Sequence, residues 1–223
     1  MNSVLRNAYR HLPEELRRAV LVRRRARLWL RAGIVFVHVP KAAGTSINLA
    51  LYGRFVGHPH ASDICRWAPS EVRALPLFSV VRNPWDRLVS AYRFVRRGVG
   101  IGEARAGIWK SERYQVPEFR SFEIFVKDWL ARRDIVRLDG VFRPQWLFVC
   151  DSDRKPLPEH IGRLEDLAPT YDFIRQNLGA APHFAHTNLS GEAVDYRKLY
   201  TPDLVRQVGD LYAEDISIFR YDF

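Results

Sequence analysis

The sequence predicts an α/β fold, in which a central, mostly parallel sheet is flanked by helices. Short, nearly continuous apolar runs rich in β-branched residues recur along the 223-residue chain, and such runs are typical of strands buried on both faces of a parallel sheet. Signals for helix starts follow these runs, so that strands alternate with helices. With 47% hydrophobic and 27% charged residues, the composition is that of a globular protein of moderate size.

The first predicted elements are a helix, a strand and a second helix. A basic helix is expected over residues 13–31. The apolar run 34–39 follows it and suits a buried strand. Thr45 or Ser46 is then expected to cap a helix, because a hydroxyl can accept a hydrogen bond from a free backbone N–H of the first turn.

The second strand and its helix have the clearest boundary in the chain. Residues 77–81 form another apolar run, and Asn83 and Pro84 come shortly after it. Asparagine is a preferred N-cap and proline suits the first helical position, so a helix is predicted to begin there. Residues 96–120 are rich in Gly, Arg and polar groups and are expected to form a long loop or lid.

The rest of the chain continues the alternation. The expected elements are a helix from Ser121 to about Arg132, a strand at 146–150, a short strand at 161–164, and helices near 169–178 and 201–214. The last helix has a clear start, because Thr201 can cap it and Pro202 suits its first position.

The positive charge is concentrated near the start of the chain. Residues 1–33 contain nine arginines and two glutamates, which gives +7 of the net +10. We therefore divide the chain into a basic helical arm, 1–33, and a main domain, 34–223. Such an arm can bind an anionic membrane surface or a polyanionic substrate, and we expect no specific nucleic acid. The alternative is a solvated amphipathic helix packed on the domain.

Cellular location is suggested only by indirect features. Cys65 and Cys150 lie far apart in the sequence and belong to no metal-spaced cluster, so we interpret them as reduced thiols. No run of about 18 apolar residues occurs, and the N-terminus has no apolar signal-peptide core. These features lead us to expect a cytoplasmic protein, either free or peripheral to a membrane.

Residues 39–46 carry the strongest chemical signal. They join the predicted strand to the predicted helix, where free backbone N–H groups and the helix dipole favour a phosphate. Lys41 supplies a mobile positive charge, Gly44 allows close backbone approach, and Thr45 and Ser46 add hydroxyl donors. The segment is not a Walker A motif, because its lysine comes at the start of the loop. An ordinary turn with a surface lysine is the alternative.

A second strand–helix unit offers a partner for another phosphate. Arg82 follows the second strand directly, and Ser90 lies two turns into the next helix. Both can reach an anion held at the carboxyl edge of the sheet, where ligands of α/β proteins bind. Arg87 and Arg93 are expected to be surface or salt-bridge residues.

Residues 36–46 and 80–92 together resemble the sulfotransferases that use 3′-phosphoadenosine 5′-phosphosulfate (PAPS), especially the carbohydrate-type branch that includes heparan sulfate 2-O-sulfotransferases. The resemblance implies a P-loop-like fold and PAPS as the sulfuryl donor, without a metal. The residues that it assigns to the 5′-phosphosulfate are Lys41, Ala42, Ala43, Gly44, Thr45 and Ser46. Arg82 and Ser90 are implied to bind the 3′-phosphate. Looser matches occur at Gln145, 161–167, 186–190 and 215–223.

Sulfuryl transfer needs a base for the acceptor hydroxyl, and histidine titrates in a suitable range. His58-Pro59-His60 lies between the two motifs, and the resemblance implies that one of these histidines is the base, His60 first and His58 second. The alternative is a pair of loop histidines without catalytic duty. His38 is expected to have a hydrogen-bonded core role, and His183 and His186 are weaker candidates for the pocket.

The expected reaction is a single in-line displacement, with Lys41 and the Gly44–Ser46 amides stabilising negative charge on the leaving group. The acceptor is expected to be a carbohydrate or another hydroxylated molecule. Two other functions compete with this one. A small-molecule kinase would also bind nucleotide phosphates, and a non-enzymatic binder of anionic membrane or nucleic acid would use the basic arm.

Overall fold

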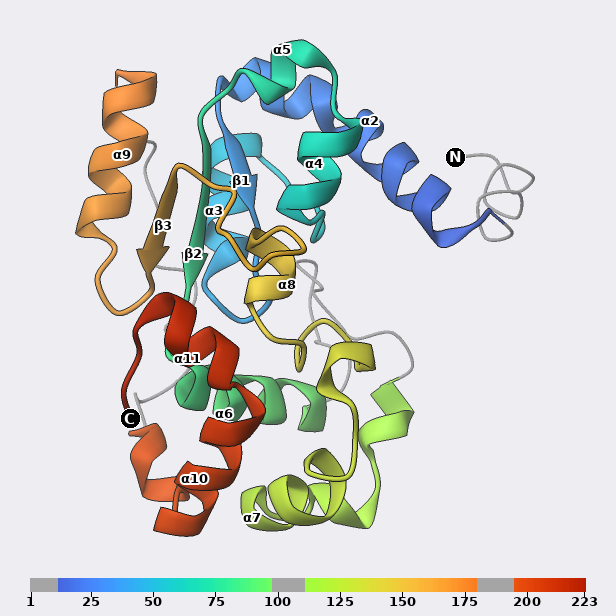
Figure 1. Ribbon diagram of the computed structural model, residues 1–223, viewed down its shortest axis with the longest axis vertical. Helices are drawn as coiled ribbons and strands as arrows, with labels where there is room; N and C mark the ends of the chain where they lie inside the picture. The colour runs from blue at the N-terminus through green and yellow to red at the C-terminus, as the bar shows by residue number, and fades with distance from the viewer. Residues whose placement is uncertain (1–11, 98–110, 180–194) are drawn as a thin grey trace. The chain divides into compact units, whose positions relative to one another are not determined.

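The computed structural model describes residues 12–97, 111–179 and 195–223, and its helices and strands are shown in Figure 1. The chain forms two compact units. Unit 1 comprises residues 1–39, 43–80 and 146–188, and unit 2 comprises residues 40–42, 81–145 and 189–223. The chain therefore crosses from one unit to the other several times, and each unit is described by itself.

Unit 1 contains a three-stranded sheet in the order β1-β2-β3. The strands are β1 (Val35–Val37), β2 (Leu77–Val81) and β3 (His160–Arg163), and only Val81 falls in unit 2. β1 and β2 are parallel, with Val35 opposite Leu77 and Val37 opposite Ser79. Every residue of β1 and β2 is buried, as the continuous apolar runs predict for strands covered on both faces.

Helices surround this sheet, which confirms the predicted α/β fold. They are α2 (Glu14–Ala32), α3 (Gly44–Tyr52), α4 (Ala61–Trp67), α5 (Ser70–Arg73), α8 (Trp146–Val149) and α9 (Ala168–Leu178). The core between sheet and helices is formed by Ile34, Phe36, Ile47, Phe78, Val80 and Ile174. Figure 1 shows α9 beside β3 and α2 near α4 and α5.

The basic helix α2 is part of unit 1. It buries one face, formed by Ala19, Val22, Ala26 and Trp29, and packs against α3, α4 and α5. Arg25 Nε donates to the Val56 carbonyl at 3.0 Å. A packed amphipathic helix was one of the two alternatives for residues 1–33. The described residues of this range form such a helix, α2. Within the described ranges, no helix combines the length and the apolar character needed to cross a bilayer.

Unit 2 is helical. Its elements are α6 (Pro84–Arg96), η1 (Ser111–Tyr114), η2 (Pro117–Phe119), α7 (Phe122–Ile124), η3 (Phe125–Leu130), η4 (Ile135–Arg137), η5 (Tyr196–Leu199), α10 (Pro202–Leu211) and α11 (Ala213–Phe219). Aromatic rings form the centre of its core: Phe119 and Phe125 lie 4.9 Å apart between centroids, and Phe142 lies 5.3 Å from Trp129. Residues 98–110 of the predicted loop lie outside the described residues.

Three predicted helix starts are confirmed by their caps. The side chain of Asn83 accepts from the backbone N–H of Trp85 at 3.1 Å, and Pro84 is the first residue of α6. Ser121 Oγ accepts from the Ile124 N–H, where α7 begins and continues as the π-helical η3. The side chain of Thr201 caps α10 in the same way.

Two predicted boundaries are wrong. Residues 146–149 form the helix α8 rather than a strand, with the Cys150 N–H donating to the Trp146 carbonyl at 2.8 Å. Five apolar residues are too few to show a period, and Pro144 just upstream favours a helix start. Helix α3 begins at Gly44, and Ala43 takes the cap position without a side-chain cap, so neither Thr45 nor Ser46 caps it.

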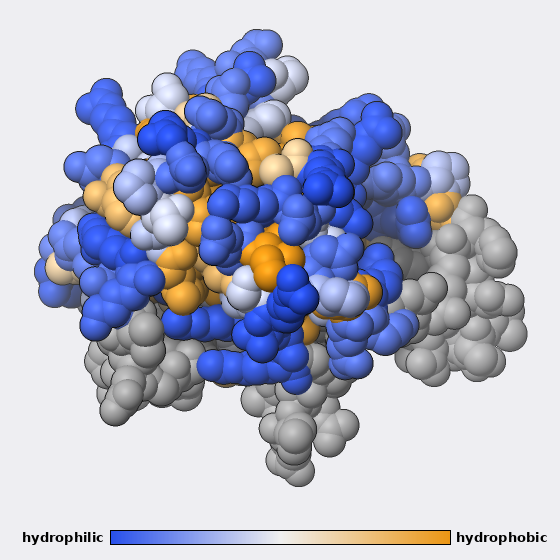
Figure 2. Space-filling model, turned by 90° about the horizontal axis from the view of Figure 1, so that it is seen from below, coloured by the Kyte–Doolittle hydropathy of each residue, from blue (hydrophilic) through white to orange (hydrophobic). Residues whose placement is uncertain are grey.

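The surface matches the charged composition of the chain. In the view of Figure 2, most of the surface is hydrophilic, and hydrophobic residues appear as patches between charged and polar side chains. Cys65 is exposed and Cys150 is buried, and both are free thiols.

Candidate functional site

The phosphate-loop segment, residues 39–46, is divided between the units. Residues 40–42 belong to unit 2, whereas Val39 and the residues from Ala43 onward belong to unit 1. Lys41 and Ala43 both have left-handed backbone conformations, with φ of 70° and 56°. Such conformations are uncommon for residues other than glycine and cost about 1–3 kcal/mol, and they cluster at ligand sites.

In unit 2, two arginines of the second motif hold the carbonyl groups of this segment. Arg87 Nη1 donates to the Pro40 carbonyl at 3.3 Å, and Arg82 Nη1 donates to the Lys41 carbonyl at 3.2 Å. In a trans peptide the N–H group points opposite the carbonyl. The amides of Lys41 and Ala42 are therefore aimed away from the arginines that fix these two carbonyls.

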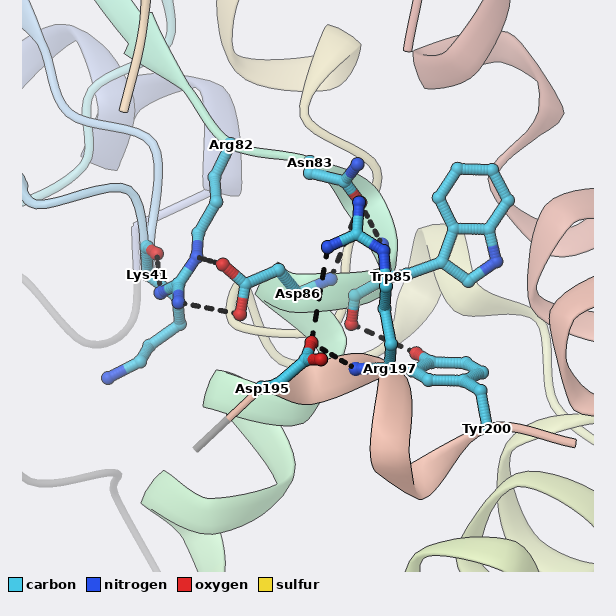
Figure 3. A network of polar contacts seen from close by, with 8 residues as sticks. All are labelled: Lys41, Arg82, Asn83, Trp85, Asp86, Asp195, Arg197 and Tyr200. Atoms are coloured by element: carbon cyan, nitrogen blue, oxygen red, sulfur yellow. Dashed lines mark hydrogen bonds and ion pairs between the residues drawn. The ribbon is translucent and has the colours of Figure 1, made fainter. Parts of the chain in front are cut away.

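Arg82, which lies between β2 and α6, is held chiefly by an ion pair with Asp86 in the first turn of α6. Its Nε and Nη2 each donate to the carboxylate of Asp86 at 2.8 Å. Figure 3 shows Arg82 between the Asp86 carboxylate and the Lys41 carbonyl. These contacts use three of the five N–H donors of a guanidinium, so Arg82 retains donors for a further anion. Ser90 lies one turn beyond Asp86 on α6 and is half-buried.

The ammonium group of Lys41 is in an unusual environment for a lysine. Its Nζ lies 4.1 Å from the ring centroid of Phe94. Burial, followed by the positive charges of Arg82 and Arg97, lowers the pKa of Lys41 to about 8. Figure 3 shows its amino group directed away from Asp86. Lys41 forms no ion pair with any described residue.

Arg87 is not a surface residue, contrary to the prediction. It is 1% exposed. Its guanidinium donates to the carbonyls of Val141 and Arg143, besides Pro40, and lies 5.7 Å from the Tyr212 ring. Burial lowers the pKa of Arg87, opposed by neighbouring acidic groups. A buried charge is tolerated when hydrogen bonds satisfy its donors. Here three backbone carbonyls accept from Nη1 and Nη2, whereas the buried Nε has no hydrogen-bond partner among the described residues.

Gln145 is the second buried group that shapes this region of unit 2. Its side-chain oxygen accepts from the Arg82 N–H at 2.9 Å, and its amide nitrogen donates to the Arg82 carbonyl at 2.8 Å. The Gln145 N–H in turn donates to the buried carboxylate of Asp215 at 2.8 Å. The backbone of Arg82 is thus fixed on both sides, immediately after β2.

In unit 1, His38 and Asn48 hold the start of α3. His38 is 4% exposed, and its Nδ1 lies 3.0 Å from Asn48 Nδ2. Asn48 Nδ2 also donates to the Gly44 carbonyl at 2.8 Å. A Cβ added to Gly44 would lie 1.8 Å from the His38 ring. The prediction of a hydrogen-bonded core role for His38 is confirmed.

His58 and His60 have different surroundings within unit 1. The Nδ1 of His58 lies 2.9 Å from the His38 carbonyl oxygen, and the centroids of the His38 and His58 rings are 4.2 Å apart. A carbonyl only accepts, so Nδ1 carries the proton and Nε2 of the neutral ring has the lone pair. Burial lowers the pKa of His58, and the bond to the carbonyl partly opposes this. His60 occupies the N-cap position of α4, 4.9 Å from the Phe148 ring.

The first turn of α3 contributes Gly44, Thr45 and Ser46. Thr45 and Ser46 are half-buried. The first N–H groups of a helix have no partner within the helix, and no side chain caps this one. Helix α3 has nine residues, and its first turn has small side chains and no cap. Such a helix start is suited to binding an anion.

The remaining histidine candidates contribute less. His160 Nε2 lies 3.0 Å from Thr170 Oγ1, and burial lowers the pKa of His160. His183 and His186 lie outside the described residues. Across the described ranges, no group of three or more His, Cys, Asp or Glu side chains is arranged to bind a metal ion.

Asn48, Asp86 and Arg87 belong to this region although sequence reasoning did not assign them a role. Asp86 could have been suspected as a partner of Arg82, because it is an acidic residue in the first turn of the predicted helix, four positions after this arginine. Asn48 is likewise four residues from Gly44. Arg87 offered no such local signal, since its partners Val141 and Arg143 are more than 50 positions away.

Comparison with known proteins gives one match. The model of a protein family described as "Sulfotransferase family" matches residues 30–222. Searches of curated proteins and of solved structures found no match. The family match covers both units, including the phosphate-loop segment and the whole of α6.

Proposed function

The chain belongs to the sulfotransferase family, and we propose that it transfers the sulfuryl group of PAPS to a hydroxyl group of a carbohydrate-type acceptor. One observation carries this proposal within the family. Lys41 has a half-buried ammonium group beside two arginines and no carboxylate partner among the described residues. Clustered positive charge of this kind suits a polyanionic ligand.

The residues present fit the 5′-phosphosulfate end of PAPS. No side chain caps the first turn of α3, which consists of Gly44, Thr45 and Ser46, and the first N–H groups of a helix have no partner within the helix. Ala42 and Ala43 have side chains too small to cover the backbone. When bound, PAPS supplies an activated sulfuryl group and a phosphate leaving group. Lys41 and the Gly44–Ser46 amides are proposed to stabilise the charge that grows on the oxygen between phosphorus and sulfur.

The 3′-phosphate is proposed to contact Arg82 and Ser90. Arg82 keeps unused donors despite its pairing with Asp86. Ser90 lies on α6, the helix that follows Arg82, and is half-buried. A phosphate here would meet a guanidinium whose orientation is already set by a bidentate pair, which limits the entropy lost on binding.

The acceptor proton is proposed to pass to His58, with His60 as the second candidate. This order reverses the one predicted from the sequence, because the bond from His58 Nδ1 to the His38 carbonyl leaves Nε2 as a proton acceptor. His58 takes the hydroxyl proton while the acceptor oxygen bonds to sulfur. The bond from sulfur to the phosphate oxygen breaks, and 3′-phosphoadenosine 5′-phosphate leaves.

The test is a transfer assay with ³⁵S-labelled PAPS and a panel of hydroxylated acceptors, with mass spectrometry of the products. We expect wild-type protein to label at least one carbohydrate acceptor. Lys41→Ala should reduce turnover by about 100-fold or more, whereas Lys155→Ala, which changes an exposed lysine, should not. Absence of any sulfated product would reject the proposal, and magnesium-dependent ATP turnover would favour the kinase.

Helix α2 is proposed to provide a second, weaker interaction with an anionic membrane surface. Arg23, Arg27 and Arg31 are exposed and lie four residues apart, so they form a stripe on one side of the helix. Replacing all three with glutamine should weaken sedimentation with phosphatidylserine vesicles and leave sulfuryl transfer unchanged. Equal sedimentation of the triple variant and the wild type would reject this role.

A further inference from the structure

The ring of His38 explains why residue 44 is glycine. A Cβ on residue 44 would lie 1.8 Å from Cδ2 and 2.2 Å from Nε2 of His38. These separations are far below van der Waals contact. Gly44 does not have a positive φ, so residues other than glycine could adopt its backbone conformation. The requirement for glycine therefore comes from the neighbouring ring rather than from the conformation of the loop.

Hydrogen bonds fix that ring against the first turn of α3. The Gly44 carbonyl only accepts, so the Asn48 atom facing it is the amide nitrogen. The second hydrogen of the same nitrogen is then available to His38 Nδ1 at 3.0 Å. His38 therefore accepts at Nδ1. Asn48 is 0% exposed, so water does not compete for these two bonds.

The same residue also orients His58. The His38 carbonyl accepts the proton of His58 Nδ1, and the His38 ring lies 4.2 Å from the His58 ring. Among the described residues, the other rings that lie near His58 are those of Phe55 and Phe148. Within those ranges His38 is the titratable ring beside His58, and it touches both the first turn of α3 and the candidate base.

We propose that His38 is a positioning residue for sulfuryl transfer. Its side chain sets where the first turn of α3 begins, and its carbonyl fixes the tautomer and direction of His58. The kinetic part of this inference rests on the proposed function. The steric part, in which the His38 ring fills the space beside Gly44, is independent of it.

The steric part is tested by a double-mutant cycle. Gly44→Ala should lower the midpoint of urea unfolding, because the added methyl meets the ring. His38→Ala removes the ring, so the double variant should unfold at a higher urea concentration than Gly44→Ala alone. Gly209→Ala is the matched control, since a Cβ there would meet Trp85 only at 3.4 Å, and its effect should add to that of His38→Ala.

The kinetic part is tested with His38→Ala and the conservative His38→Asn, whose side-chain oxygen can replace Nδ1 as acceptor. We expect His38→Ala to lower kcat at least tenfold with less than a threefold change in the KM for PAPS, and His38→Asn to recover part of the loss. Removing the ring exposes His58 and raises its pKa toward the ordinary value. The acidic limb of the kcat profile should therefore move to higher pH, which a merely structural loss would not cause.

The possible results separate this inference from the proposed function. If wild-type protein transfers sulfate but the cycle shows no coupling, or if His38→Ala keeps wild-type kcat and the same acidic limb, the positioning role is wrong. If wild-type protein transfers nothing from PAPS, the proposed function and the kinetic part fail together. The unfolding cycle would then still decide the steric part.

Discussion

The two halves of the phosphate-loop segment are held in different ways. In unit 2, Pro40 and Lys41 are fixed through their carbonyls by the charged side chains of Arg87 and Arg82. In unit 1, Gly44 is fixed by the neutral side chains of His38 and Asn48, through one hydrogen bond and close packing. Charged hydrogen bonds therefore hold the half at Pro40 and Lys41, whereas packing of neutral side chains mainly holds the half at Gly44.

This difference separates two requirements of the proposed anion site. The half near Lys41 must keep a positive charge while it is partly removed from water, and the neighbouring arginines make that costly. The half near Gly44 needs only unobstructed backbone N–H groups, which a neutral and tightly packed support provides. Variants in the two halves should therefore have different effects. Those near Lys41 should alter the local charge and the stability, and those near Gly44 should alter the packing of the first turn of α3.

The largest effect is expected at Arg87. Arg87→Met leaves three backbone carbonyls without their donor, and each unsatisfied buried group costs about 1–3 kcal/mol. Loss of the buried charge offsets part of this, so we expect the free energy of unfolding to fall by about 3 kcal/mol. Urea unfolding followed by fluorescence would measure the change.

Arg93→Met is the matched control for Arg87→Met. Arg93 lies on the same helix, is half-exposed, and its side chain has no described partner, so its replacement should change stability by no more than about 0.5 kcal/mol. Equal effects of the two replacements would show that the carbonyl contacts of Arg87 contribute nothing specific.

The next effect concerns the charge of Lys41 and depends on pH. The ammonium binds an anion only when protonated, and its pKa in the free protein is about 8. Affinity for PAPS should be constant below this pKa and should weaken as pH rises through it, by up to about tenfold per pH unit. Calorimetric titration with PAPS between pH 6.5 and pH 9.5, about 1.5 units on either side of that pKa, would measure this change.

Lys41→Arg is the control for this pH dependence, because a guanidinium stays charged throughout the range. The arginine variant should bind PAPS with an affinity that does not vary with pH. A pH-independent affinity in the wild type, or the same decline in the arginine variant, would show that Lys41 is not the titrating group.

The features that could be predicted from the sequence are those set by neighbouring residues. The strand at 77–81 and the helix start at Asn83 follow from a local apolar run and a local cap. Lys41 and Gly44 could be predicted as site residues, because a phosphate needs a positive charge and close approach of the backbone. In contrast, the burial of Arg87 depends on Arg143, 56 positions away, and no local pattern indicates such a contact.

The reason for Gly44 illustrates the same limit. Sequence reasoning attributed this glycine to close approach of a phosphate, whereas the structure places the His38 ring against it. Both residues lie in the recognised motif, but the sequence does not show that the ring turns toward the helix. The strand predicted at 146–150 is wrong for a related reason, since five apolar residues suit a helix or a strand equally well.

The smallest expected changes in stability concern the first turns of α6 and α3, and they distinguish a capped helix start from an uncapped one. Asn83 caps α6 by accepting from the N–H groups of Trp85 and Asp86, at 3.1 and 3.5 Å, so Asn83→Ala should reduce the free energy of unfolding by about 1 kcal/mol. Thr45 lies in the first turn of the uncapped helix α3. Thr45→Ala should change stability by less than about 0.5 kcal/mol, yet weaken PAPS binding through loss of the hydroxyl.

Urea unfolding and calorimetric binding of PAPS, measured on both variants, would show whether α3 is left uncapped for a ligand. In that case added PAPS should raise the unfolding midpoint of wild-type protein more than that of Thr45→Ala, because a ligand that binds only the folded state stabilises it according to its affinity. A Thr45→Ala protein that loses as much stability as Asn83→Ala without ligand would mean that Thr45 supports the helix itself, and the contrast between a capped structural start and an open binding start would not hold.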